Sequence, residues 1–143
     1  MIKLLAAALL LLVVGCDRVP GTNAHMIRQA EAQASHDLAD PASAQFRETV
    51  VAKAKRDISV LPGGPVIKQG ASYVCGQMNA KNHLGAYTGF KGFIVEPATE
   101  TVFAEPNDGV ILDDKMKRMI FTTTYATECS AAAGLRMMNQ TAP

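Results

Sequence analysis

The sequence predicts an α+β fold in which a small antiparallel sheet of about three to five strands is flanked by an N-terminal and a C-terminal helix. Three observations support this prediction. Apolar residues recur at helical spacing near both ends of the chain, whereas short apolar runs separated by turn residues fill its middle. Cys75 falls in one of these runs and Cys129 in the C-terminal helix, so one disulfide would join the sheet to that helix.

The chain begins with a segment typical of an export signal. Lys3 precedes an apolar run over residues 4–14, which is too short to cross a bilayer. The run ends in Val13-Val14-Gly15-Cys16, which resembles the lipobox of bacterial lipoproteins. In that family the cysteine is lipidated, with palmitate among its acyl chains, and the preceding peptide is removed. The resemblance implies a signal peptide over residues 1–15 and a lipid on Cys16; a plain signal peptide with an incidental cysteine is the alternative.

The same resemblance implies a place in the cell. The protein would lie in the bacterial cell envelope, on the periplasmic side, with the lipid on Cys16 holding it to a membrane. Asp17 resembles the inner-membrane retention signal of enteric lipoproteins and favours the inner membrane. Residues 16–23 are polar and contain Pro20 and Gly21, which predicts a short tether. Residues 24–143 then suit a single domain with one core.

The charge balance excludes one class of partner. The chain has 14 basic and 13 acidic residues, and removal of the signal takes away only Lys3. A neutral mature protein lacks the basic surface that nucleic acid requires, so we expect no nucleic-acid partner.

The spacing of apolar residues in the first third of the domain predicts a helix followed by a strand. Helical spacing over residues 24–38 predicts the helix, with Asn23 as its N-cap and Asp40-Pro41 as its end. From Phe46 to Lys55 the period changes to that of a half-buried strand. The apolar residues expected on one face of this strand are Phe46, Val50, Ala52 and Ala54.

Turn residues then divide the chain into further strands. A Pro- and Gly-rich turn at residues 61–65 precedes a strand over residues 71–79. Residues 90–95 and 101–104 predict a hairpin, and residues 110–112 a further short strand after the turn at 107–109. A helix capped by Asp113 or Asp114 continues towards Cys129, with a kink or break expected at the three threonines 122–124. Its inward face carries Phe121, Tyr125 and Cys129.

Export determines the expected chemistry of the cysteines. Lipidation would use Cys16 and leave Cys75 and Cys129 as a pair in a compartment where disulfides persist. The 54 positions between them correspond to about 4 kcal/mol of stabilisation in the chain-entropy model. Free thiols or a metal pair are the alternative, but no His or further Cys lies at ligand spacing near either residue. We therefore expect a disulfide, no metal and no cofactor.

Few residues suit catalysis, and we predict no catalytic residue. His25 and His36 would lie about 16 Å apart along the first helix and could not share a metal. His83 lies alone in a loop, and capping explains the adjacent Asp113 and Asp114. The chain has no Gly-x-Ser-x-Gly sequence and no phosphate-binding loop.

Three blocks of sequence carry a second resemblance. They are Asp40-Pro41-x-Ser43-Ala44-x-Phe46-Arg47, Val74-Cys75-Gly76-x-x-Asn79-Ala80-Lys81-Asn82 and Gly85-x-Tyr87-x-Gly89-Phe90. The pattern is similar to a group of small uncharacterised bacterial proteins, some of them prophage-linked. The resemblance implies a small α+β domain and brings no established activity. Ala86 stands where a second glycine is common in that group.

The segment from residue 79 to 90 is the densest polar region, and two interpretations of it stay open. In the structural interpretation, Asn79 and Asn82 bond the backbone, two glycines supply positive φ, and Tyr87 and Phe90 pin the loop to the core. In the functional interpretation, the loop is a recognition surface on a rigid frame. The residues of that surface are Lys81, Asn82, Tyr87 and Thr88.

These observations leave three functional hypotheses. The first is a non-catalytic lipoprotein whose loop over residues 79–90 binds an envelope protein or another envelope component. The second is an inhibitor of an envelope enzyme such as lysozyme. The third is an envelope hydrolase that uses His83 with a carboxylate. The sequence does not decide the oligomeric state.

Overall fold

The computed structural model describes residues 20–105 and 112–140, and for residues 112–114 and 131–140 it describes the backbone only. The expected α+β class is confirmed: two helices flank a four-stranded antiparallel sheet with strand order β1-β2-β3-β4. The elements are α2 (Asn23–Ser35), the short 3-10 helix η3 (Pro41–Ser43), β1 (Gln45–Lys53), β2 (Ser72–Asn79), β3 (Lys91–Glu96), β4 (Thr101–Ala104) and α3 (Leu112–Gln140).

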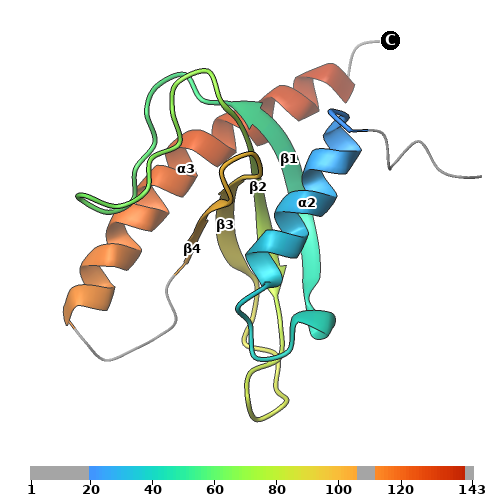
Figure 1. Cartoon of the computed structure of the whole chain (residues 1–143), viewed down its shortest axis with the longest axis vertical. Helices are drawn as coiled ribbons and strands as arrows, with labels where there is room; N and C mark the ends of the chain where they lie inside the picture. The colour runs from blue at the N-terminus through green and yellow to red at the C-terminus, as the bar shows by residue number, and fades with distance from the viewer. Residues whose placement is uncertain (1–19, 106–111, 141–143) are drawn as a thin grey trace, which may run out of the picture.

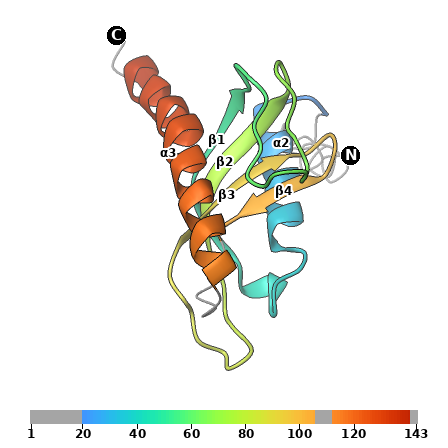
Figure 2. The same cartoon turned by 90° about the vertical axis from the view of Figure 1, so that its left-hand side faces the viewer.

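The two helices cover opposite faces of the sheet (Figures 1 and 2). On one face, Ala30 and Ala34 of α2 pack on a cluster made by Val74, Met78, Phe93 and Val95. On the other face, Phe121 and Cys129 of α3 pack on a cluster that includes Tyr73, Cys75, Ile94 and Phe103. The expected Cys75–Cys129 disulfide joins β2 to α3 in this second cluster, with the two Cα atoms 5.6 Å apart.

Two glycines allow the layers to approach closely. A Cβ atom on Gly92 would lie 2.9 Å from a ring carbon of Tyr125 on α3. A Cβ atom on Gly76 would lie 2.6 Å from a ring carbon of Phe93, its cross-strand partner. Side chains at these positions would push α3 away from the sheet or displace the Phe93 ring.

A bulge in β1 corrects the predicted strand face. Arg47 pairs with Gln77 but Val50 pairs with Cys75, so two residues of β1 oppose one residue of β2. Glu48 lies in the bulge with a φ of 56°. The bulge reverses the alternation: Phe46 packs against the α2 cluster, whereas Val50 packs against the α3 cluster. The prediction that Phe46 and Val50 share a face was therefore wrong.

Both helices also differ from the prediction. Thr22, not Asn23, caps α2, because its Oγ1 accepts a hydrogen bond from the backbone N–H of His25 at 3.2 Å. Asn23 thus belongs to the helix rather than to the tether. The helix α3 continues without a break through residues 122–124. The Thr123 hydroxyl donates to the carbonyl of Met119, so this polar side chain finds its hydrogen-bond partner within the helix.

The predicted strand over residues 110–112 also needs correction. Leu112 begins α3, whereas residues 110 and 111 and the predicted turn at 107–109 lie outside the described residues. In the described part of the chain, no helix is both long enough and apolar enough to cross a membrane.

The two long connections lie at different ends of the sheet. The connection over residues 54–71 joins β1 to β2 in the upper part of Figures 1 and 2, where α2 also begins. The connection over residues 80–90, which we call the distal loop, joins β2 to β3 at the lower end of both views. The start of the domain and the distal loop therefore lie towards opposite ends of the molecule.

Candidate functional site

The distal loop is supported by the first of the three sequence blocks. The backbone N–H of Lys81 donates to the hydroxyl of Ser43 at 2.9 Å, and the Tyr87 hydroxyl donates to the Ser43 carbonyl at 3.3 Å. The Ser43 hydroxyl in turn donates to the carbonyl of Asp40 at 2.8 Å. The short helix η3 therefore holds the loop through Ser43. The first sequence block contacts the second at Lys81 and the third at Tyr87.

Hydrogen bonds within the loop hold its backbone. The Asn82 side-chain oxygen accepts from the N–H groups of Leu84 and Ala86, at 2.9 and 3.1 Å. The Asn79 side-chain oxygen accepts from the N–H of Gly89 at 3.0 Å. The predicted backbone bonding by both asparagines is confirmed.

Glycines make the conformation of the loop possible. The φ angles of Gly85 and Gly89 are positive, as predicted, at 79° and 97°. Residues other than glycine rarely adopt such values. Lys81 and Tyr87 form an isolated antiparallel bridge across the base of the loop. The distal loop is thus a defined structure rather than a flexible connection.

The two aromatic residues do not act as predicted. Tyr87 is 44% exposed and is held through its hydroxyl at η3 rather than through packing in the core. Phe90 is half-buried, and the guanidinium carbon of Arg47 lies 3.8 Å from its ring centroid. This cation–π contact joins the end of the loop to the bulged part of β1.

The sequence analysis missed the most exposed large apolar residue of the loop. Leu84 is 91% exposed, and its N–H is held by the Asn82 side chain. His83, which directly precedes it, and Thr88, four residues further along the chain, are also exposed. The sequence offers only a weak signal for Leu84, a large apolar residue inside a polar segment, because this pattern does not distinguish an exposed leucine from a buried one.

A hollow of about 450 Å³ lies at the base of the loop. Of the predicted site residues, Lys81, Asn82 and Thr88 line this hollow, whereas Asn79, Tyr87 and Phe90 do not. His83 lines it together with two carboxylates, Asp37 and Glu105. Among residues 20–105 and 112–140, however, His83 has no hydrogen bond or ion pair with either carboxylate. The hollow therefore contains both cationic and anionic side chains, but no histidine that a carboxylate orients as a general base.

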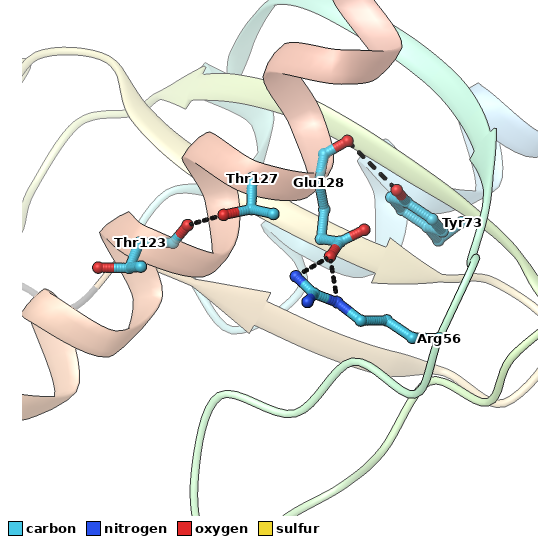
Figure 3. Close-up of polar contacts among 5 residues, drawn as sticks. All are labelled: Arg56, Tyr73, Thr123, Thr127 and Glu128. Carbon is cyan, nitrogen blue, oxygen red and sulfur yellow. Dashed lines mark hydrogen bonds and ion pairs between the residues drawn. The ribbon is translucent and has the colours of Figure 1, made fainter.

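A second polar cluster lies at the other end of the domain, between the 54–71 connection and α3 (Figure 3). Arg56 donates from Nε and Nη2 to the same carboxylate oxygen of Glu128, at 3.1 and 2.8 Å. The Tyr73 hydroxyl donates to the Glu128 backbone carbonyl at 3.3 Å. Burial, with a further contribution from the charge of Glu128, raises the pKa of Tyr73 to about 12. Sequence reasoning did not foresee this cluster, because its members are far apart in the chain.

Neither metal chemistry nor known relatives define the site. Within the described residues, no group of three or more His, Cys, Asp or Glu side chains could hold a metal ion. No protein-family model, curated protein or solved structure matches this chain. The function must therefore be inferred from the contacts and exposure of the protein's own residues.

Proposed function

We propose that this protein is a lipoprotein of the bacterial envelope, anchored through Cys16 on the periplasmic side, that binds a protein partner through the distal loop and catalyses no reaction. The observation that supports this proposal is Leu84, an almost fully exposed leucine on a backbone held in place by Asn82. Exposed leucines are common on protein surfaces. Leu84 differs because its loop is ordered before binding, which lowers the entropic cost of association.

The position of the loop agrees with such a role. Residues 16–22 can span at most about 25 Å when fully extended, so a lipid on Cys16 would hold the start of α2 close to the bilayer. The distal loop lies towards the opposite end of the domain (Figure 1). It would therefore face away from the membrane and be accessible to a partner in the periplasm.

The partner surface that suits this loop has an apolar recess with polar groups around it. Leu84 would enter the recess, while Thr88, His83 and Lys81 would contact its rim. Interfaces of this kind depend on a few anchoring side chains surrounded by polar contacts. A narrower form of the proposal is an inhibitor whose projecting loop blocks the active-site cleft of an envelope enzyme such as lysozyme.

The hydrogen bonds of the loop determine which substitutions can test a contact without changing the loop conformation. Asn82 and Tyr87 hold the loop together, so replacing them would remove the loop conformation along with any contact. Leu84→Ser combined with Thr88→Ala leaves those hydrogen bonds in place, and Leu61→Ser is the matched control on the 54–71 connection. Crosslinking in the native envelope should lose its partner in the double variant and keep it in the control. If the folded double variant still captures the partner, the loop is not the binding site.

Two further experiments separate the parts of the proposal. The inhibitor form predicts that the purified protein protects cells from lysozyme in a direct lysis assay, and absence of protection rejects that form. The anchor predicts that Cys16→Ser releases the protein into the soluble fraction. Persistent membrane association of that variant would show a different anchor and would leave the role of the loop untouched.

A further inference from the structure

The strand β1 has an open edge in the described part of the sheet. The Ala54 N–H donates to the carbonyl of Ala71 and the Ala54 carbonyl accepts from Gly70, so the backbone groups of Ala54 face β2. Backbone groups alternate in direction along an antiparallel strand. Those of Val51 and Lys53 therefore point away from the sheet. No backbone hydrogen bond from another described residue satisfies them.

A groove runs beside this edge. It has a volume of about 850 Å³ and lies between β1, the start of the 54–71 connection and α3. Val51, Ala52 and Ala54 supply apolar surface, and Tyr73 and Thr127 contribute to the lining. Figure 3 shows the part of the groove near α3, where Arg56 reaches across to Glu128. An extended chain could therefore lie along β1 and still contact α3.

The groove has an excess of positive charge. Its cationic residues are Lys53, Lys55 and Arg56, and Glu128 is its one carboxylate among the described residues. Arg56 already pairs with Glu128 at 2.8 Å. Among the residues whose side chains the structure describes, 20–105 and 115–130, no ion pair involves Lys53 or Lys55. Two cations thus remain beside a row of outward-facing backbone groups.

We infer that an extended, acidic segment of a partner protein adds to the sheet at the edge of β1. Its backbone would pair with Val51 and Lys53, and its carboxylates would lie near Lys53 and Lys55. The regular edge is short because the bulge at Glu48 interrupts it. The site therefore suits about three or four residues of the partner segment. The proposal does not depend on the distal loop or on the lipid anchor.

Two other occupants fit the edge less well. A second copy of the chain paired through β1 would bring Lys53 and Lys55 of both copies together, and like charges across paired strands are destabilising. An anionic membrane surface would attract the lysines. Its phosphates, however, only accept hydrogen bonds, so they would leave the carbonyls of Val51 and Lys53 unpaired. A peptide supplies both donors and acceptors.

The test uses a defined probe and the purified full chain in detergent micelles. The probe is the fluorescent peptide acetyl-Gly-Glu-Val-Glu-Val-Glu-Gly-amide, with two analogues: one with Gln in place of Glu, and one N-methylated at alternate residues. We expect the probe to bind with a dissociation constant of about 1 mM or lower. The dissociation constant of each analogue should be about ten times higher. In nuclear magnetic resonance spectra, the amide signals of Val51 and Lys53 should shift with the probe.

Variants of the groove complete the test. Lys53→Gln with Lys55→Gln, which removes two positive charges, should weaken probe binding about tenfold, whereas Lys115→Gln, which removes one positive charge at an exposed position of α3, should not alter it. Val51→Pro removes an outward N–H without breaking a bond to β2, and it should weaken binding. Val51 also packs against the α2 cluster, so the melting temperature should fall, and circular dichroism checks that the variant is folded where binding is measured. If that variant fails to fold, the N-methylated analogue provides the same test of backbone pairing.

Several results would overturn the inference. One is equal binding of the acidic peptide and its Gln analogue, and another is probe binding that leaves the Val51 and Lys53 amides unshifted. Absence of probe binding at about 1 mM would also contradict it. Phosphatidylcholine–phosphatidylglycerol vesicles that shift these amides while the peptide does not would assign the edge to a lipid surface. Dimerisation through the same amides would assign it to a second copy.

Discussion

The two long connections of this protein are held in place by different means. In the 54–71 connection, Ile58, Val60 and Ile67 are buried, and Ile58 and Ile67 pair through two backbone hydrogen bonds of 2.9 Å. In the distal loop the most apolar side chain, Leu84, is 91% exposed, and backbone N–H groups that donate to the side chains of Asn82 and Ser43 hold the conformation.

The two connections therefore have different roles: one stabilises the fold, and the other exposes an apolar side chain on a fixed backbone. The 54–71 connection extends the hydrophobic core and contributes to the free energy of folding through burial. The distal loop buries little and contributes little, yet polar bonds specify its conformation. A loop with a defined conformation and an exposed apolar residue is suited to recognition. Substitutions in the two connections and in the core around them test this contrast.

The largest effect should come from the disulfide, which lies in the same cluster as Ile58 and Ile67. Replacing Cys75 and Cys129 by serine removes a link across 54 positions and should lower the free energy of unfolding by about 4 kcal/mol. Urea unfolding measures this loss. At low temperature, where the variant remains folded, the amide signals of the distal loop should stay unchanged. If the distal loop lost its structure together with the α3 cluster, the loop would not be held independently of the core.

The next effect concerns the buried 54–71 connection. Ile67 is fully buried, so Ile67→Ala should lower the free energy of unfolding by about 3 kcal/mol. Leu61→Ala lies in the same connection at 36% exposure and should cost well under half as much. Thermal and urea unfolding of both variants measure the difference. Equal losses would show that this connection is not held by burial of Ile67.

A smaller effect is expected in the distal loop. Asn82→Ala removes the acceptor for two backbone N–H groups and should lower the free energy of unfolding by about 1 kcal/mol. Asn82→Asp keeps an acceptor at that position and is the matched control. Hydrogen exchange at Leu84 and Ala86 should accelerate in the alanine variant only. Unchanged exchange at both amides would mean that Asn82 does not order the loop.

The last effect is a pH dependence at the opposite end of the domain. Burial raises the pKa of Tyr73 from an ordinary value of 10.0 to about 12. The unfolded chain therefore loses this proton first: the contribution to stability is complete below pH 10 and disappears as the pH rises through about 12. Tyr73→Phe should flatten this alkaline loss, measured by urea unfolding at several pH values. The remaining loss includes Tyr125, whose pKa burial also raises. The same alkaline slope in Tyr73→Phe would contradict this assignment.

Sequence patterns predicted the fold well where local rules dominate. Helical spacing identified α2, and the compartment implied by Cys16 led to the Cys75–Cys129 pair. The bulge at Glu48 could not be read from alternation, because it depends on pairing with β2. The three threonines of α3 suggested a break, but packing of Phe121 and Cys129 outweighs their low helix propensity.

The candidate site was predicted less completely. Asn79 and Asn82 were assigned backbone roles correctly, because Asx side chains near glycines favour such turns. The bracing of the loop by Ser43 joins residues 38 positions apart and has no local signal. Nor could the exposure of Leu84 be predicted, because a lone leucine in a polar segment is as easily a buried anchor. The groove at β1 forms only when α3 lies beside the sheet.

The central claim is that the distal loop presents Leu84 to a partner. Its most direct test places a photo-crosslinking amino acid at position 84 or, as the control, at position 61 of the full chain produced in its native cells. We predict one dominant crosslinked protein from position 84, absent from position 61 and lost when Thr88 is also replaced by a bulky residue. The same crosslinked proteins from both positions, or none from position 84, would contradict the claim.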